Sequence, residues 1–329
     1  MSKYILDFDD YMTAEAEKRG ISKPQELYEP INYLLSLSGK RIRPLLSLLG
    51  CAIVSGGHRA ALPAAAAIEL FHNFTLMHDD IMDKSAVRRG QPTVHEQYDT
   101  NTAILSGDAM LVLAYESLLR EAKNVTILPI LHTFNSVAIA VCEGQQMDMN
   151  FEQRDHVTEA EYIEMIRLKT AVLLGGALKI GAYCGNATDN DADLLYQFGE
   201  NIGIAFQLQD DILDTFGDQA TFGKRIGGDI LNNKKTFLWL KAHENATEND
   251  RTLLHQYAAQ QPQTTTEEGE KIAAVTHIYT KAGARAAAES AMQSYYQKGL
   301  IALQKIRSNE AEALEILYII ADNLMQREV

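Results

Sequence analysis

Two groups of aspartates in this 329-residue chain repeat one spacing inside apolar segments. LMHDDIMD and FQLQDDILD contain Asp79, Asp80, Asp83, Asp210, Asp211 and Asp214. Helix positions four apart share a face, so the first and last carboxylates of each group point the same way. Like charges this close repel, and carboxylates in apolar surroundings are costly. A divalent cation offsets both costs, and an oxygen-only ligand set suits Mg²⁺. The spacing therefore predicts two metal-binding carboxylate clusters, and two acidic helix faces at the surface are the alternative.

Basic residues gather in three other segments. GKRIRP, VRRGQPTVH and FGKRIGGDILNNKKT contain Lys40, Arg41, Arg43, Arg88, Arg89, Lys224, Arg225, Lys234 and Lys235. Arginine binds phosphate oxygens through its planar fork, and lysine acts as a compact point charge. Each segment alone could be an exposed face or a helix end. Together with the aspartates they indicate a diphosphate held partly through metal and partly directly.

The formal net charge of −14 argues against a nucleic-acid partner, because binding a polyphosphate backbone requires a basic face. A small phosphorylated substrate stays possible, since it needs only a few local cations or a bridging metal. Hydrophobic residues make up 46% of the chain, which is too apolar for disorder and ample for a core.

Helical periodicity dominates the sequence, and alternating strand patterns with Asn-Gly turns are missing. The clearest apolar helical segments span residues 41–56, 63–83, 101–122, 161–185 and 191–217. These segments predict an all-α chain of roughly ten or more helices, many largely buried. Residues 243–271 are polar and rich in Gln and Thr, which indicates a surface helix and loop rather than a linker. We therefore expect one domain over residues 1–329.

The apolar runs are shorter than a membrane span needs, so no membrane span is expected. The acidic start MSKYILDFDDYM differs from a secretory signal, which predicts no export. The cysteines Cys51, Cys142 and Cys184 lie far apart without a C-x-x-C pair, which favours reduced thiols in a cytoplasmic protein.

Between residues 39 and 236 the chain resembles the trans-isoprenyl diphosphate synthases of the polyprenyl synthetase family. The motifs that carry the resemblance follow the family's order: GKRIRP, ELFHNFTLMHDDIMDKSAVRRGQPTVH, SGDAML, EGQQMD, RLKTAVLL, FQLQDDILD, FGK and NNKKT. The resemblance implies a class I terpenoid synthase fold, in which mostly antiparallel helices surround a deep central cavity. It also implies a homodimer and Mg²⁺-dependent catalysis.

Carried over position by position, the resemblance implies that the six aspartates bind the metal ions that hold an allylic diphosphate. The residues implied to contact that diphosphate directly are Arg88, Lys169, Lys224 and Lys234. The residues implied to hold the diphosphate of isopentenyl diphosphate are Lys40, Arg43, His72 and Arg89. Thr170 and Gln207 are expected to face the reacting carbons. Lys234 is preferred because the family pattern is Lys-x-Thr, with Lys235 as the alternative; His78 and His95 are expected to be structural.

The implied reaction suits these residue types. Loss of diphosphate from an allylic carbon builds negative charge on the leaving oxygens, which metal ions and cations stabilise. The double bond of isopentenyl diphosphate attacks the allylic cation, and a proton is then lost. No side-chain nucleophile is needed.

Three other functions remain open. A terpenoid cyclase usually carries an Asn/Ser/Glu triad at its second site, where this chain has aspartates again. A His-Asp phosphohydrolase would use MHDD but needs further histidines and leaves the second cluster unexplained. A non-catalytic partner subunit tends to lack one aspartate motif or its basic partners, all of which are present.

Residues just before Asp79 bear on product length, because family members with aromatic side chains there stop the growing chain early. Phe74, Thr75 and Phe71 are the fifth, fourth and eighth residues before Asp79. This combination resembles enzymes with a twenty-carbon product, geranylgeranyl diphosphate, and fifteen carbons is the alternative. An ideal helical wheel places Thr75 and Phe71 nearer Asp79 than Phe74, so either phenylalanine could block the chain or be ordinary core.

Overall fold

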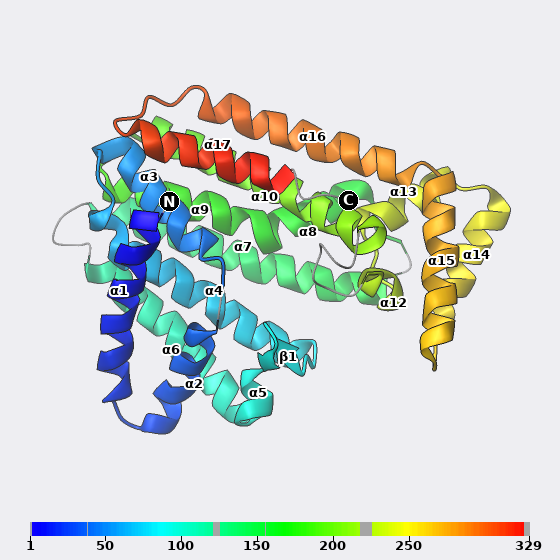
Figure 1. Ribbon diagram of the computed structural model, residues 1–329, viewed down its shortest axis with the longest axis horizontal. Coiled ribbons are helices and arrows are strands. Elements are labelled where there is room, and N and C mark those ends of the chain that lie inside the picture. The colour runs from blue at the N-terminus through cyan, green and yellow to red at the C-terminus, as the bar shows by residue number, and fades with distance from the viewer. Residues whose placement is uncertain (1, 38, 121–125, 155, 218–225, 326–329) are drawn as a thin grey trace. The chain divides into compact units, whose positions relative to one another are not determined.

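The computed structural model describes residues 2–37, 39–120, 126–154, 156–217 and 226–325 (Figure 1). Within these ranges regular structure is almost entirely helical, which confirms the predicted all-α fold. The backbone contacts divide the chain into two compact units. Unit 1 comprises Met1–Ala138, Gly176–Tyr196 and Ile306–Leu317, and unit 2 comprises Ile139–Gly175, Gln197–Lys305 and Tyr318–Val329. The single domain expected over residues 1–329 stays a prediction.

Unit 1 contains the first six α-helices and a short 3₁₀ turn, η1 (Arg59–Ala61). These helices are α1 (Ser2–Gly20), α2 (Gln25–Ser36), α3 (Ile42–Ser55), α4 (Leu62–Met82), α5 (Val94–Gln97) and α6 (Thr100–Leu119). Helix α4 packs against both α3 and α6, and its alanine-rich first half is buried on all sides. Its first turn contains Pro63, whose missing N–H is tolerated there. The last turn of α4 carries the first aspartate cluster.

A hairpin follows α4 and was not foreseen from the sequence. Strands β1 (Val87–Arg88) and β2 (Gln91–Pro92) pair antiparallel. The two residues between them, Arg89 and Gly90, have φ angles of 54° and 76°. Two positive φ angles in a two-residue loop are typical of a type I′ turn, which matches the twist of paired strands. The Arg-Arg-Gly sequence therefore places its two arginines differently: Arg88 ends strand β1, and Arg89 lies in the turn.

Among the helices that the structure describes, four have residues in both units: α7 (Ile127–Gln153), α9 (Val172–Cys184), α10 (Asp189–Phe216) and α17 (Ala311–Met325). The helices that lie wholly in unit 2 are α8 (Glu159–Ile166), α12 (Gly228–Leu231), α13 (Phe237–Asn245), α14 (Glu248–Ala259), α15 (Thr265–Lys281) and α16 (Ala284–Leu303). A π-helical segment, η3 (Arg167–Ala171), links α8 to α9. Most of the apolar core of unit 2 comes from side chains of α8, α10, α13, α15 and α16.

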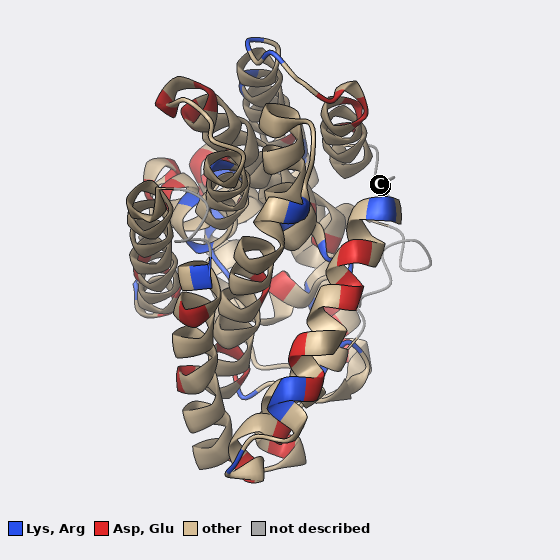
Figure 2. Ribbon diagram, turned by 90° about the vertical axis from the view of Figure 1, so that its left-hand side faces the viewer, with Lys and Arg blue, Asp and Glu red and all other residues tan. Residues whose placement is uncertain are grey.

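The polar segment 243–271 contains α14 and the first turns of α15, and most of its side chains are exposed. This confirms the predicted surface helix and loop. Charged residues of both signs are interspersed along the described helices in Figure 2, without one continuous basic face in that view.

Three described helices are long and apolar enough to cross a membrane, judged by length and composition only. They span Arg59–Met82, Thr100–Leu119 and Ile127–Gln153, and 61%, 39% and 28% of their most apolar stretches are buried. The sequence expectation of no membrane span therefore stays a prediction.

Candidate active site

The first aspartate cluster lies at the carboxyl end of α4. Asp79 and Asp80 occupy the last turn, and Asp83 caps the helix with its N–H 2.8 Å from the Asp79 carbonyl oxygen. The last turn of α4 contains no basic residue. Carboxylates at this end of a helix oppose the helix dipole, which favours cations there. The local fold therefore leaves a negative site that a cation would stabilise.

Asp80 and Arg88 form a bidentate ion pair within unit 1. Arg88 Nε donates to Asp80 Oδ2 and Arg88 Nη2 donates to Asp80 Oδ1, both at 2.7 Å. Asp80 is only 2% exposed. Parallel N–H donors matched to a carboxylate are the strongest form of ion pair. Arg88 is expected to contact the allylic diphosphate. The ion pair holds it beside the aspartates that are expected to bind this diphosphate through metal ions.

Four residues predicted to hold the second diphosphate also belong to unit 1. Arg43 Nη1 lies 3.1 Å from His72 Nε2. Arg89 Nη1 donates to the Leu37 carbonyl oxygen at 3.1 Å, and a Cβ added at Gly39 would lie 2.9 Å from the same nitrogen. The GKRIRP segment, which includes the exposed Lys40, therefore packs beside Arg89.

Positive charge and burial shape this cluster. Burial lowers the pKa of Arg43 to about 10, and its Nε is buried without a hydrogen-bond partner among the described residues. Burial and the charge of Arg43 hold the pKa of His72 well below its usual range, with Arg89 and Arg88 contributing further. His72 is therefore neutral near pH 7, and the surrounding arginines provide the positive charge. An unsatisfied buried guanidinium nitrogen is costly and suits a bound anion.

The residues expected to limit product length line one side of α4. Phe71 is 1% exposed, and its ring centroid lies 5.7 Å from that of Phe74 and 5.4 Å from that of Phe134. Phe74 is partly exposed, and its ring centroid lies 4.8 Å from that of His78 in an edge-to-face arrangement. Thr75 turns its hydroxyl back to the His72 carbonyl oxygen at 2.8 Å. Phe71 is thus a core residue, whereas Phe74 has an open side.

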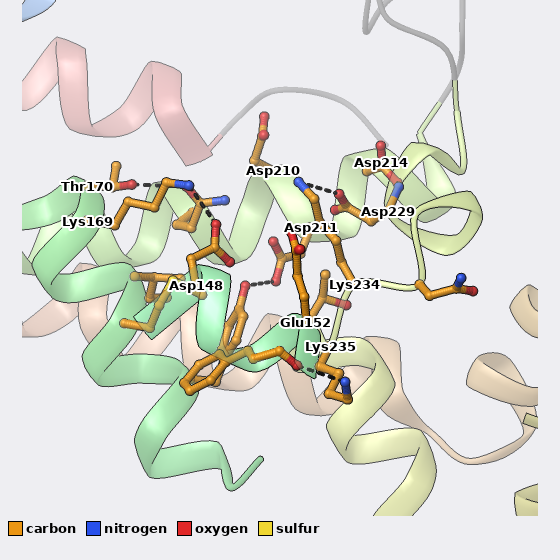
Figure 3. Close-up of a pocket in the computed structure, with 17 residues that line it drawn as sticks. Asp148, Glu152, Lys169, Thr170, Asp210, Asp211, Asp214, Asp229, Lys234 and Lys235 are labelled. Carbon is orange, nitrogen blue, oxygen red and sulfur yellow. Dashed lines mark hydrogen bonds and ion pairs between the residues drawn. The ribbon is translucent and has the colours of Figure 1, made fainter. Parts of the chain in front are cut away.

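The second aspartate cluster lines a cavity of about 220 Å³ within unit 2 (Figure 3). Asp210, Asp211 and Asp214 occupy the last two turns of α10, again with no basic residue in the last turn. Asp211 is 3% exposed and accepts a hydrogen bond from the buried Tyr162 hydroxyl. Its pocket-facing neighbour Asp229 comes from α12.

Two of these carboxyl groups, Asp211 and Asp214, have raised pKa values and therefore resist ionisation. Burial and the charge of Asp229 raise the pKa of Asp211 well above its usual range. The same two causes raise the pKa of Asp214 to about 6, although Asp214 Oδ2 accepts the Asp229 N–H at 3.0 Å. Among the described residues, no three Asp, Glu, His or Cys side chains are grouped closely enough to hold a metal ion by themselves. Mg²⁺ is usually bound by one or two carboxylates together with substrate phosphates, so a bound diphosphate would have to complete such a site.

The three predicted catalytic residues meet at the same cavity. Lys169 and Thr170 lie in the π-helical segment η3, and the Thr170 hydroxyl lies 3.5 Å from Gln207 Oε1 on α10. Lys169 Nζ donates to Asp148 Oδ2 on α7 at 2.6 Å. Gly144 permits this approach, because a Cβ there would lie 2.2 Å from the Lys169 nitrogen. Single π-helical segments within helices occur frequently at functional sites.

Lys234 and Lys235 both line the cavity but point differently (Figure 3). Lys234 Nζ lies 3.4 Å from Asp229 Oδ1, and Lys235 Nζ donates to the Phe151 carbonyl oxygen at 2.8 Å. This arrangement favours Lys234, the residue preferred on sequence grounds. Lys224, also predicted to contact the allylic diphosphate, lies outside the described residues.

Several residues of this cavity were not predicted from the sequence. They are Asp148, Glu152, Tyr162 and Asp229. Asp148 stands in the EGQQMD motif and Asp229 follows FGKRIGG, so the motifs were seen but their acidic members were not assigned. Neither shares the D-D-x-x-D spacing that singled out the other aspartates.

Comparison with known proteins gives one consistent answer. The polyprenyl synthetase family profile matches residues 24–276. A geranylgeranyl diphosphate synthase of Methanosarcina mazei is 38% identical over 309 residues, which cover 94% of this chain and 92% of that protein. A geranylfarnesyl diphosphate synthase of Aeropyrum pernix is 33% identical over 310 residues, which cover 92% and 95%. A crystal structure of a geranylgeranyl pyrophosphate synthase aligns with a TM-score of 0.89 and 40% identity over 98% of this chain and 99% of that one. The chain belongs to the polyprenyl synthetase family of prenyltransferases.

Proposed function

We propose that this enzyme condenses isopentenyl diphosphate with an allylic diphosphate and releases a twenty-carbon trans-prenyl diphosphate, geranylgeranyl diphosphate. The observation that carries the proposal is the placement of both D-D-x-x-D clusters. Each lies in the last turns of a helix that has no basic residue there. Each cluster has a cationic side chain from its own unit beside it. This side chain is Arg88 at the first cluster, in unit 1, and Lys234 at the second, in unit 2.

Mg²⁺ fits these carboxylates when a substrate diphosphate completes the ligand set, because this ion is usually held by one or two carboxylates plus phosphate oxygens. The available ligands are carboxylate oxygens. Burial and, to a smaller extent, repulsion from neighbouring carboxylates raise the pKa of Asp214 to about 6. Bound Mg²⁺ would supply Lewis-acid stabilisation of the departing diphosphate. In this proposal the aspartates of both clusters supply the carboxylate oxygens, and Asp80 and Asp211 in addition accept hydrogen bonds from Arg88 and Tyr162.

The chain's own cations complete the binding of the leaving group. Lys169 and Lys234 contribute positive charge from opposite sides of the unit 2 cavity, where each is paired with an aspartate (Figure 3). Positive groups fixed in place before the reaction stabilise charge that develops on the leaving oxygens without reorganisation cost. Thr170 and Gln207 present uncharged oxygens beside them, which suits the carbon cation left behind.

The Arg43, His72, Arg89 and Lys40 cluster is proposed to bind the diphosphate of isopentenyl diphosphate. Support comes from the buried Nε of Arg43, which has no hydrogen-bond partner among the residues that the structure describes, and from the neutral His72 next to it. Arg89 lies in the hairpin turn and adds the second guanidinium. A diphosphate at this cluster would satisfy the buried donor and neutralise the local excess of positive charge.

One assay tests the proposed reaction against its alternatives. The protein is incubated with farnesyl diphosphate, labelled isopentenyl diphosphate and Mg²⁺, and the products are separated by chromatography after dephosphorylation. Labelled geranylgeraniol supports the proposal. Free phosphate without elongation would indicate a phosphohydrolase, cyclised hydrocarbon a cyclase, and no turnover a non-catalytic partner subunit.

The proposed product length rests on the residues that precede the first aspartate cluster. Phe74 and Phe71 precede the first aspartate cluster, and both aromatic rings support a short product. Relatives named for geranylgeranyl and for geranylfarnesyl diphosphate support twenty carbons or slightly more. Chromatography of the same reaction with geranyl and farnesyl primers separates a fifteen-carbon from a twenty-carbon end point.

A homodimer is proposed from the outer face of α6. Leu105, Val112 and Leu119 repeat every seven residues and are 60%, 67% and 55% exposed. An apolar stripe with heptad spacing suits a partner helix. A second copy of this chain is the proposed partner, in preference to lipid. Light scattering without detergent should give a dimer, and Val112→Glu should give a monomer. We also propose a cytoplasmic location, which is supported by the wide separation in sequence of Cys51, Cys142 and Cys184 and can be tested by cell fractionation.

A further inference from the structure

Helix α15 places a lysine on its buried face. Lys271 is 2% exposed and shares that face with Val275, Ile278 and Tyr279, four, seven and eight residues later. Lysine is almost never fully buried unless it is paired. Among the described residues, Lys271 Nζ donates to two oxygens, Asn233 Oδ1 at 2.7 Å and the Gln260 carbonyl at 3.1 Å. Neither acceptor is a carboxylate, so this cation serves a purpose other than an ion pair.

Its closer acceptor belongs to a turn with an unusual backbone. Asn233 has a φ of 54°, the left-handed region that few residues other than glycine and asparagine adopt. The turn is closed by the Asn233 N–H at 3.2 Å from the Ile230 carbonyl oxygen and by the Lys234 N–H at 2.9 Å from the Asp229 carbonyl oxygen. The side chain of Asn233 thus hydrogen-bonds to α15 while its backbone reverses the chain.

The direction of the chain after Asn233 decides which lysine faces the carboxylates. Lys234 Nζ lies 3.4 Å from Asp229 Oδ1, and the next side chain, Lys235, instead reaches the Phe151 carbonyl oxygen (Figure 3). A different backbone angle at Asn233 would turn both side chains. The 2.7 Å hydrogen bond from Lys271 therefore holds Asn233, the residue whose backbone sets the direction of the Lys234 side chain.

Helix α15 contacts the other end of the same turn as well. Gly227 has a φ of 81°, and a Cβ there would lie 2.7 Å from Ile272 Cδ1. The Gly227 N–H donates to the Asp214 carbonyl oxygen at 2.6 Å. Residues 227–233 are therefore held between α10, which carries the aspartates, and two adjacent residues of α15.

We propose that Lys271 is a positioning residue of the diphosphate site. Through Asn233 it fixes the turn that aims Lys234 at the leaving group, although Lys271 itself contacts no substrate. The proposal rests on the proposed function, in which Lys234 binds the allylic diphosphate. It predicts that loss of Lys271 weakens diphosphate binding in unit 2 and leaves the isopentenyl diphosphate site in unit 1 unchanged.

The first test compares Lys271→Met, which keeps length and burial, with Lys281→Met on the same helix. Lys281 is a suitable control because its side chain is 54% exposed and pairs with Asp250 away from the cavity. Calorimetric titration with inorganic pyrophosphate and Mg²⁺ should give a Kd at least about tenfold higher for Lys271→Met, the size expected when a hydrogen bond to a charged group is lost. In steady state the KM for the allylic substrate should rise by a similar factor. The KM for isopentenyl diphosphate should change less than about twofold.

A second pair of variants asks whether the effect passes through Asn233. Asn233→Gly keeps the left-handed backbone accessible but removes the acceptor, so it should match Lys271→Met, and the double variant should be no worse than either. Asn233→Asp restores an acceptor oxygen and should bind pyrophosphate like the natural protein. If Lys271→Met does not fold, Asn233→Gly alone carries the test.

Three results would overturn the proposal. The first two are unchanged pyrophosphate binding in Lys271→Met and Asn233→Gly, and equal KM increases for both substrates. The third is losses that multiply in the double variant, because independent effects add in free energy. Failure of the natural protein to elongate any prenyl chain would refute the proposed function instead. The pyrophosphate titration would still test the positioning role of Lys271, because it does not depend on chain elongation.

Discussion

Arg88 donates two hydrogen bonds to Asp80, one to each carboxylate oxygen, and both measure 2.7 Å. The pair joins the last turn of α4 to β1, the first strand of the hairpin. It thereby fixes the turn in which Arg89 lies. The D-D-x-x-D motif and the Arg-Arg-Gly motif are thus two halves of one anchored structure, and Asp80 has a structural task besides any contact with metal.

Arg88→Ala should destabilise the fold as well as the site. The change leaves Asp80 buried without its partner, and breaking one side of a buried pair costs about 3–5 kcal/mol. Because the Arg88 side chain is 24% exposed, we expect the free energy of unfolding to fall by about 2–3 kcal/mol. Urea denaturation measures it. The double variant Asp80→Asn/Arg88→Ala should recover most of the loss, and an equally unstable double variant would contradict the structural role.

Both aspartate clusters should be needed for turnover. Asp79→Ala and Asp210→Ala should each lower kcat by at least about 10²-fold, because ionisation of the diphosphate loses charge stabilisation. Circular dichroism should remain helical in both. Asp193→Ala is the matched control, since Asp193 also lies on α10 but pairs with Lys179 and lines no part of the cavity. Near-natural rates in either cluster variant would refute the two-cluster assignment.

Arg89→Gly should separate the two substrates. Arg89 has a φ of 54°, so glycine removes the guanidinium without strain in the hairpin turn, which alanine would not do. We expect the KM for isopentenyl diphosphate to rise about tenfold or more, as for the loss of a charged hydrogen bond, with little change for the allylic substrate. Steady-state kinetics with each substrate varied in turn measure this. Equal effects on both KM values would remove the assignment of Arg89 to isopentenyl diphosphate.

Much of the fold could be predicted because the helices are long, apolar and bounded by clear signals. The D-D-x-x-D spacing identified six acidic residues of the candidate site for the same local reason, that a helix places positions four apart on one face. The Arg-Gly hairpin was missed because its turn depends on a positive φ at Arg89, which arginine rarely adopts.

Tertiary partners were also missed. Asp148 reaches Lys169 because Gly144 lets α7 approach the π-helical segment, and no sequence period encodes a π-helical segment. Asp229 lies beside Asp214 because the Asp229 N–H donates to Asp214 Oδ2 and the Gly227 N–H donates to the Asp214 carbonyl oxygen, two contacts between segments distant in sequence. Lys271 would have been assigned to an exposed position from its residue type, yet the apolar row around it indicates a buried one. Such contacts depend on packing between distant segments rather than on local pattern.

The stability of the protein should fall at mildly acid pH through His72. Burial and Arg43 lower the pKa of folded His72 well below the usual 6.5, so the unfolded chain binds a proton that the folded chain does not. Unfolding therefore becomes easier as pH falls below about 6.5, by at most about 1.4 kcal/mol per pH unit from this group. The effect ends at the folded-state pKa. Urea denaturation between about pH 7.5 and pH 5.5 should show a smaller loss in His72→Gln than in the natural protein, and parallel pH profiles would contradict this.

Phe74→Ala should lengthen the main product by at least one five-carbon unit. Phe74 is partly exposed, whereas Phe71 behind it is 1% exposed and packs on Phe134 at 5.4 Å between ring centroids. Removing Phe74 opens space toward the substrate side, but removing Phe71 leaves a cavity in the core and costs about 3–5 kcal/mol. The two variants should thus differ in stability, and Phe74→Ala should melt closer to the natural protein. Chromatography of dephosphorylated products then decides which ring forms the floor. A shift with Phe71→Ala alone would move the floor to Phe71, and an unchanged product in both variants would mean that neither side chain meets the growing chain.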